Sequence, residues 1–294
     1  MLGRNMLVAL AVTALGCQKI WGFEDFEEGA AAGGSAGGGA GGSTGGSGGV
    51  AGSGGGGGSA GAAPCEDGTA PGGMIGVRIQ DKSCVWIDPK EVTRGEYENF
   101  RAATPTPPSI CSWNSSLDSP EKKQGTTPCL GPGETGDAGA DAAAPPTDLP
   151  VTCVDWCDAY SYCAHQNKVL CPGTINQAQK GAWFDVCSSN DANDYPYPGS
   201  FQADYCNDGS SSAKALVGVG TKTECKTPSE VYDMTGNASE WTDACSATTQ
   251  AANCDTRGGN YNDSSGVAMC NTANAVAKEM GLPGLGFRCC WLPK

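Results

Sequence analysis

The sequence predicts an α+β domain that is rich in loops and stabilised by disulfides. Short strand-like and helix-like segments are separated by stretches rich in glycine and proline, and the 294 residues include 45 glycines and 17 cysteines. So many glycines cannot all lie in one close-packed core, and part of the chain is therefore expected to be linker. Seventeen thiols would be a liability in a reducing cytosol but become cross-links in an oxidising compartment. We therefore expect an exported protein.

The N-terminus has the pattern of an export signal followed by a lipid-attachment cysteine. Arg4 precedes an apolar run over residues 6–15, which is too short to cross a hydrocarbon core ~30 Å thick. The run ends in Ala14-Leu15-Gly16-Cys17, which resembles a bacterial lipobox. We expect residues 1–16 to be a lipoprotein signal peptide and Cys17 to carry the lipid, on the outer membrane or the cell surface. The alternative is an ordinary cysteine at the end of a conventional signal.

Residues 17–64 are expected to form a disordered tether between the membrane and the folded domain. They are mostly Gly, Ala and Ser, so few side chains could offset the entropy that is lost on ordering. The glycines are no phosphate-binding loop, because no strand precedes them and no Gly-Lys-Ser/Thr occurs among them. Residues 65–294 are long enough for one sizeable core, and we expect a single domain there.

Charge and composition exclude several classes of function. The formal net charge is −14, so an acidic surface would gain no counterion release from nucleic acid, and nucleic-acid binding is not expected. His165 is the only histidine, which removes most histidine-dependent catalysis, and we expect it at an exposed helix end. The cysteines at 153, 157 and 163 lack a Cys-x-x-Cys or histidine partner, so we do not expect zinc.

Regular elements can be placed from local patterns. Residues 84–88 alternate as a strand does, and Thr93-Arg94-Gly95-Glu96 has the capping-box pattern that opens a helix. Residues 105–150 are rich in Pro, Ser, Gly and Asp, which is typical of a long surface loop. Asp155 is placed to cap a second helix, whose inward face we expect at helical spacing. The inward face of this second helix consists of Trp156, Ala159, Tyr160 and Cys163. A later helix is expected to carry Trp183 and Val186.

The sixteen cysteines after Cys17 are an even number, which permits eight disulfides. Cys157 and Cys163 share the predicted second helix, where neither is well placed to bridge the other, so each should reach a different segment. Cys289 and Cys290 are adjacent and would point to opposite faces of a strand, so they also need two separate partners.

The most distinctive stretch lies between residues 231 and 243. A turn-forming Gly236-Asn237 pair sits between Asp233 and Glu240-Trp241, so carboxylates and backbone carbonyls can converge on one point. The residues therefore favour a cation-binding turn, and a plain capped turn is the alternative. Two further motifs follow, Arg257-Gly258-Gly259 and Gly286-Phe287-Arg288-Cys289.

The order of these three motifs resembles the formylglycine-generating enzyme, or sulfatase-modifying factor, family. The resemblance extends over most of residues 87–289 and implies a C-type-lectin-like α+β fold with short strands and much irregular loop. It also implies a buried scaffold role for Arg257, Gly258, Gly259 and Arg288, and a Cys187–Cys289 disulfide. In the family the 233–240 turn holds calcium, and the corresponding ligands here are Asp233, Gly236, Ala238 and Glu240.

The family enzymes convert a substrate cysteine to formylglycine, using oxygen and a copper ion held by two thiolates. Cys270 matches the second of these cysteines, whereas residues 262–265 offer no first one. Copper(I) bound linearly needs both thiolates. We therefore expect a membrane-tethered, non-catalytic module that recognises an exported protein or glycan. The alternative is the copper-dependent oxidase, in which Cys245 or Cys254 approaches Cys270 and completes the pair.

Overall fold

The computed structural model describes residues 65, 70–114, 116–117, 146–175, 177 and 180–293. The predicted signal peptide, the lipidation site Cys17 and the tether lie outside these residues, as does the middle of the predicted 105–150 loop. Within the described ranges, no helix combines the length and the apolar character that a membrane span requires.

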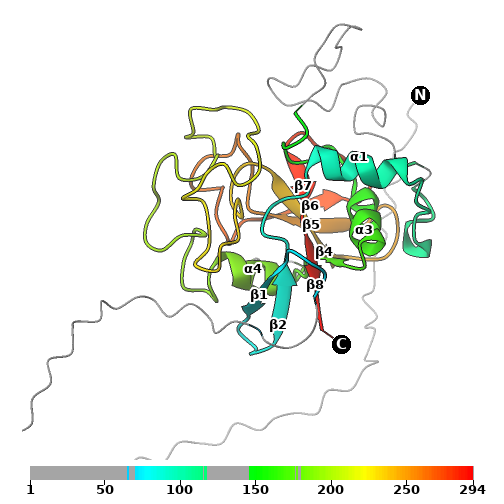
Figure 1. Ribbon diagram of the computed structural model, residues 1–294, viewed down its shortest axis with the longest axis horizontal. Helices are drawn as coiled ribbons and strands as arrows, with labels where there is room; N and C mark the ends of the chain where they lie inside the picture. Colours follow the sequence, from blue (N-terminus) through cyan, green and yellow to red (C-terminus); the bar gives the residue numbers. More distant parts are fainter. Residues whose placement is uncertain are drawn as a thin grey trace, which may run out of the picture. The chain divides into compact units, whose positions relative to one another are not determined.

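The first sheet brings the two ends of the domain together (Figure 1). Its strands are β1 (Ile75–Arg78), β2 (Cys84–Ile87), β8 (Cys289–Trp291) and β3 (Val169–Leu170), in the order β1-β2-β8-β3. All neighbours are antiparallel. The strand predicted at residues 84–88 is therefore confirmed as β2, and all four of its residues are buried.

The second sheet contains the strand into which the 231–243 stretch leads. Its strands are β6 (Ala273–Ala277), β5 (Asn253–Arg257), β4 (Ser239–Cys245) and β7 (Leu285–Phe287), in that order. The β4 and β7 strands are parallel, with Glu240 opposite Gly286 and Trp241 opposite Phe287. This pairing sets the Glu-Trp and Gly-Phe-Arg motifs side by side, although 45 residues separate Trp241 from Gly286.

Both predicted capped helices are present. The helix α1 (Arg94–Ala102) begins after Thr93 with a complete capping box to Glu96, and α3 (Trp156–His165) begins after Asp155 with a capping box to Asp158. A short 3-10 helix, η1 (Ser109–Cys111), follows α1, and α4 (Ala182–Cys187) carries Trp183 and Val186. His165 ends α3 in an exposed position, as predicted.

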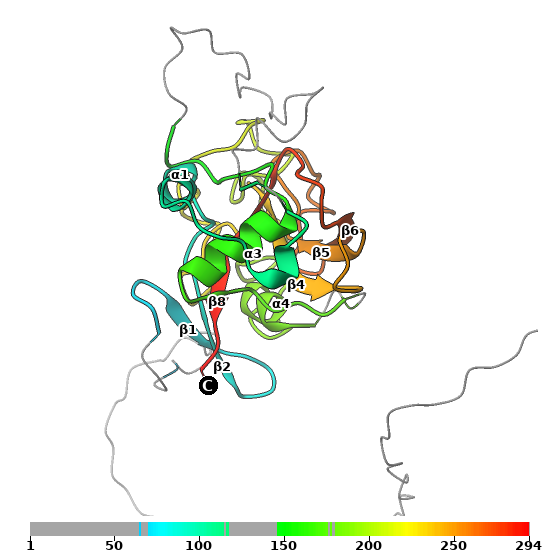
Figure 2. The same ribbon diagram turned by 90° about the vertical axis from the view of Figure 1, so that its right-hand side faces the viewer.

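Figure 2 shows α3 between α1 and the strands of the second sheet, and an aromatic core joins these elements. The Tyr162 ring lies 5.3 Å from the Phe100 ring and 5.4 Å from the Phe287 ring, and Tyr97 stacks on it at 6.0 Å. The helix α3 is buried more widely than its predicted stripe, because Cys157, Asp158 and Tyr162 are buried as well. Segments joining α4 to β4 form loops on the side away from α1 and α3 (Figure 1).

Seven disulfides lie among the described residues, and they indicate an extracytoplasmic protein. Their pairs are Cys65–Cys84, Cys111–Cys157, Cys163–Cys289, Cys171–Cys290, Cys187–Cys270, Cys206–Cys225 and Cys245–Cys254. Cys153 is disulfide-bonded too. The separate partners expected for Cys157 and Cys163, and for Cys289 and Cys290, are confirmed.

The Cys187–Cys289 pair expected from the family resemblance does not occur. Pairing of β8 with β2 and β3 places Cys289 against the C-terminal half of α3, where Cys163 is its partner. Cys187 ends α4 and meets Cys270 instead. The expected pair fails because both of its cysteines have nearer partners, Cys163 for Cys289 and Cys270 for Cys187.

Candidate functional site

The 231–243 stretch forms a buried turn that leads directly into β4. Asp233, Gly236 and Asn237 all have positive φ angles, of 54°, 73° and 55°. At Gly236 a Cβ atom would lie 2.6 Å from the Asn207 carbonyl oxygen, so no other residue fits this close approach. All residues from Asp233 to Glu240 are buried. The turn is therefore an interior element, held by contacts on every side.

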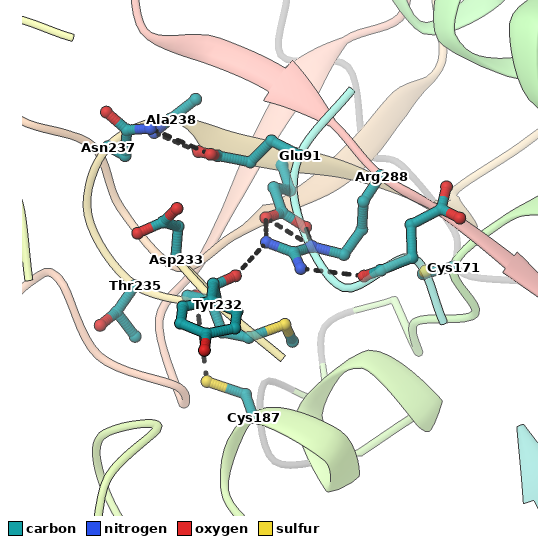
Figure 3. Close-up of polar contacts among 12 residues, drawn as sticks. Glu91, Cys171, Cys187, Tyr232, Asp233, Thr235, Asn237, Ala238 and Arg288 are labelled. Carbon is teal, nitrogen blue, oxygen red and sulfur yellow. Dashed lines mark hydrogen bonds and ion pairs between the residues drawn. The ribbon is translucent and has the colours of Figure 1, made fainter. Parts of the chain in front are cut away.

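Arg288 ties this turn to two other segments. Its guanidinium pairs with the Glu240 carboxylate, with Nη2 2.6 Å from Oε1 and Nε 2.8 Å from Oε2. It also donates to the Tyr232 carbonyl at 2.8 Å and to the Asp88 carbonyl at 3.2 Å (Figure 3). Both side chains of the pair are at most 1% exposed. Trp183 Nε1 donates to Glu240 Oε2 at 2.7 Å, so each oxygen of this carboxylate is engaged.

A second carboxyl, Glu91, reaches the turn from the loop between β2 and α1. Its Oε1 accepts from the Ala238 amide at 2.9 Å and its Oε2 accepts from Asn237 Nδ2 at 2.9 Å (Figure 3). Burial, together with the nearby carboxylates of Asp233 and Glu240, raises the pKa of Glu91 well above its ordinary value. Glu91 belongs to the Glu91-Val92-Thr93 stretch that precedes α1 and resembles a helix start of the family, but nothing in that local pattern indicates that its carboxyl reaches Asn237 and Ala238.

Asp233 lies at the opposite end of the turn from Glu240. Its Oδ2 accepts from the Gly220 amide at 2.5 Å, whereas its Oδ1 is buried and has no hydrogen-bond partner among the described residues. Burial raises the pKa of Asp233 to about 6, although the Gly220 amide and Arg288 oppose the increase. An unpaired carboxylate in this position is costly when charged.

The four residues expected to hold calcium lie in one turn, but the carboxylate of Glu240 is already engaged by other groups. Glu240 would have to leave Arg288 and Trp183 before it could coordinate a cation. In the described part of the chain, no group of three or more His, Cys, Asp and Glu residues is placed to hold a metal. Asp233 Oδ1 is the side-chain acceptor of this set that has no hydrogen-bond partner among the described residues. Calcium binding stays a prediction, and the contacts of Glu240 argue against it.

The Arg257-Gly258-Gly259 motif packs the 260–270 segment against the turn. Arg257 Nη2 lies 3.3 Å from Asp255 Oδ2 and from the Thr174 carbonyl oxygen. A Cβ atom at Gly258 would lie 2.5 Å from the Met234 carbonyl oxygen, and one at Gly259 would lie 2.9 Å from the backbone of Ala268. Both glycines also have positive φ, so the close approach requires glycine.

The cysteine that matches an active-site thiol, Cys270, forms a structural disulfide. Cys270 is disulfide-bonded to Cys187, and both are fully buried. Cys245 and Cys254, which would have had to complete a copper pair, are bonded to each other across β4 and β5. The alternative in which Cys245 or Cys254 approaches Cys270 to complete the thiolate pair is therefore not realised in this structure. These donors do not fit a copper(I) site, which requires free thiolates.

The fold and the three motifs agree with a family match over residues 71–292, to the sulfatase-modifying factor enzyme 1-like domain. Because the match covers most of the chain, this protein belongs to that family. No curated protein sequence matches the chain.

Solved structures of similar fold include PvdO from Pseudomonas aeruginosa, with a TM-score of 0.51 and 18% identity, covering 72% of this chain and 82% of PvdO. Treponema denticola variable protein 1 is similar at a TM-score of 0.48 and 16% identity, over 75% of this chain and 95% of that one. At these identities the likeness to PvdO shows the α+β fold alone.

Proposed function

We propose that this protein is an exported, membrane-tethered binding module that uses the family fold without oxidase activity. The observation that carries the proposal is the Cys187–Cys270 disulfide, which takes the only cysteine that matches an active-site position. Formylglycine formation needs thiolates that hold copper and exchange one position with a substrate cysteine. A sulfur held in a disulfide can neither bind copper as a thiolate nor exchange its place with a substrate cysteine.

Reduction of this disulfide would not by itself create an accessible site. Cys187 and Cys270 are 0% exposed and belong to a core cluster with Trp183 and Met234. The Cys270 amide also donates to the Asp194 carbonyl, which fixes the segment against the loop after α4. A substrate peptide would therefore have to displace core side chains to reach either sulfur.

The rest of the domain suits recognition of an exported protein or glycan. Long connections run over its surface, and disulfides hold several of them, including Cys206–Cys225 within the 188–238 segment. Loops positioned by a rigid scaffold are the usual carriers of binding residues. Cross-linking also lowers the entropy that such loops lose on binding.

The oxidase alternative is tested directly. The full-length chain is loaded with copper(I), with its disulfides intact and again after reduction, and then given oxygen and a peptide with the Cys-x-Pro-x-Arg motif. Mass spectrometry of the peptide is expected to show no aldehyde in either state. Aldehyde formation that is lost in Cys270→Ser but kept in Cys245→Ser would overthrow the binding-module proposal.

The membrane tether is tested separately. Cys17 is the cysteine of the lipobox-like sequence, so Cys17→Ser is expected to release the protein from the membrane fraction. Metabolic labelling with a fatty acid should likewise be lost in this variant. A membrane-bound Cys17→Ser protein would show that lipid on Cys17 is not the anchor.

A further inference from the structure

A cavity of about 280 Å³ lies beside the loop that joins β2 to α1, and no motif of the family resemblance assigns it a ligand. Residues 88–93 form one wall, and Tyr162 of α3 and Lys168 contribute another. Gly72, Gly73 and Val219 complete the lining. Small-molecule pockets usually measure about 300–1,000 Å³, so this cavity suits a ligand of one ring.

Three of the charged groups that line the cavity, Asp88, Lys168 and Glu96, have hydrogen-bonding or ionic partners within the protein. Lys168 Nζ lies 2.6 Å from Asp88 Oδ1, and both side chains are less than one-fifth exposed. Glu96 Oε2 accepts from the amide and hydroxyl of Thr93, both at 2.8 Å. Lys90 Nζ lies 6.0 Å from the centre of the Tyr232 ring. An ionic ligand at Asp88 or Lys168 would have to break this largely buried pair, which is costly away from water, whereas the exposed Lys90 and Glu96 offer one charge of each sign.

The charge of the lining is also balanced. Asp88 and Glu96 contribute two negative charges, and Lys90 and Lys168 contribute two positive charges. The carboxyl of Glu91, which also lines the cavity, is directed toward Asn237 and Ala238 by its two hydrogen bonds. A neutral ligand is consequently favoured over an anion or a cation.

One hydrogen-bonding group of the cavity lacks a partner. The Tyr162 hydroxyl makes no hydrogen bond within the described part of the chain and is open to solvent in the cavity, although the side chain as a whole is only 6% exposed. Its ring is fixed by Phe100, Phe287 and Tyr97, so the hydroxyl is held in one place. Burial, with the charges of Glu96 and Asp88, raises the pKa of Tyr162, which keeps the hydroxyl protonated and able to donate.

We infer that this cavity binds one neutral, polyhydroxylated ring, a monosaccharide unit of a glycan. Each sugar hydroxyl can donate to a carboxylate oxygen of Asp88 or Glu96 and accept from Tyr162 or Lys168. These hydrogen bonds would use the lone pairs and N–H groups that the Lys168–Asp88 ion pair leaves free, so the pair would stay intact. The inference rests on the proposed binding role and gives that role a ligand class.

The test uses the full-length chain in a detergent without a sugar head group. Methyl glycosides of glucose, galactose, mannose and N-acetylglucosamine are titrated, and binding is followed by saturation-transfer NMR and calorimetry. At least one glycoside is expected to bind. Tyr162→Phe removes only the hydroxyl and should weaken that binding about threefold to tenfold, which is the usual effect of one lost hydrogen bond.

Two further variants keep the test falsifiable. Tyr97→Phe is the matched control, because the Tyr97 ring stacks on Tyr162 while its buried hydroxyl does not line the cavity, and its binding should equal that of the wild type. Val219→Trp keeps every polar group and should abolish binding by filling the cavity.

Three results would overturn the inference: no glycoside binds, Tyr162→Phe binds as the wild type does, or glycine betaine binds in place of the glycosides. If no glycoside binds and the copper assay also yields no aldehyde, only the sugar site is contradicted and the binding-module proposal stands. Aldehyde formation would instead remove the proposed function.

Discussion

The two ends of the 231–243 turn differ in how they hold a buried negative charge. At one end, Glu240 accepts from Arg288 and Trp183, so its charge is compensated at 2.6–2.8 Å. At the other end, Asp233 has one oxygen without a hydrogen-bond partner in the described part of the chain, and its pKa is raised to about 6. Both carboxyls are about equally buried, at 1% exposure. Burial alone therefore does not decide whether the charge of a carboxylate is compensated; here the position of Arg288 decides it.

The largest expected effect comes from breaking the compensated end. Arg288→Met would leave Glu240 buried without its counter-charge, and removing one partner of a buried pair usually costs about 3–5 kcal/mol. Denaturant unfolding, with all disulfides intact, should show this loss in the free energy of unfolding. A double variant, Arg288→Met with Glu240→Gln, should recover part of it, because no charge then remains unpaired. A single variant as stable as the wild type would show that the pair is unimportant.

A smaller effect, of opposite sign, is expected at the uncompensated end. Because the pKa of Asp233 is higher in the folded protein than its ordinary 3.8, the folded state holds this proton more tightly. Its contribution to stability is present below about pH 4 and is lost as pH rises through about 6. Two pKa units correspond to about 3 kcal/mol at most.

Asp233→Asn removes that penalty and tolerates the positive φ of the site. The variant should be more stable than the wild type at pH 8 by about 1–3 kcal/mol, and nearly equal to it at pH 3.5. Unfolding free energies measured at both pH values, in the presence of a chelator, decide the matter. An equal difference at the two pH values would contradict a raised pKa at Asp233.

Calcium gives the smallest expected effect. Since Glu240 is engaged by Arg288 and Trp183, adding calcium should leave the melting temperature nearly unchanged. Magnesium at the same concentration is the control for ionic strength. A calcium-specific rise that disappears in Glu240→Gln would show that Glu240 can exchange Arg288 for the ion, and would restore the ligand set that the family resemblance implies.

Local signals in the sequence determined the elements on which they act directly. Thr93 and Asp155 cap their helices because a side-chain oxygen near a helix start finds free amides within three residues. The pattern at residues 84–88 also located β2, although all four residues of the strand are buried rather than alternately buried and exposed. The order of the Glu-Trp, Arg-Gly-Gly and Gly-Phe-Arg motifs indicated the family, and the family in turn predicted the fold.

Only the tertiary structure decided the pairing and the charge state of the site. Cys289 could have reached Cys187 or Cys163, and the register of β8 between β2 and β3 selected Cys163. Glu91 and Arg288 are 197 residues apart, so no local pattern could show that both enclose one turn. Partner choice and pKa depend on distances between segments, which a linear sequence does not contain, whereas caps and strand alternation depend on neighbours within a few residues.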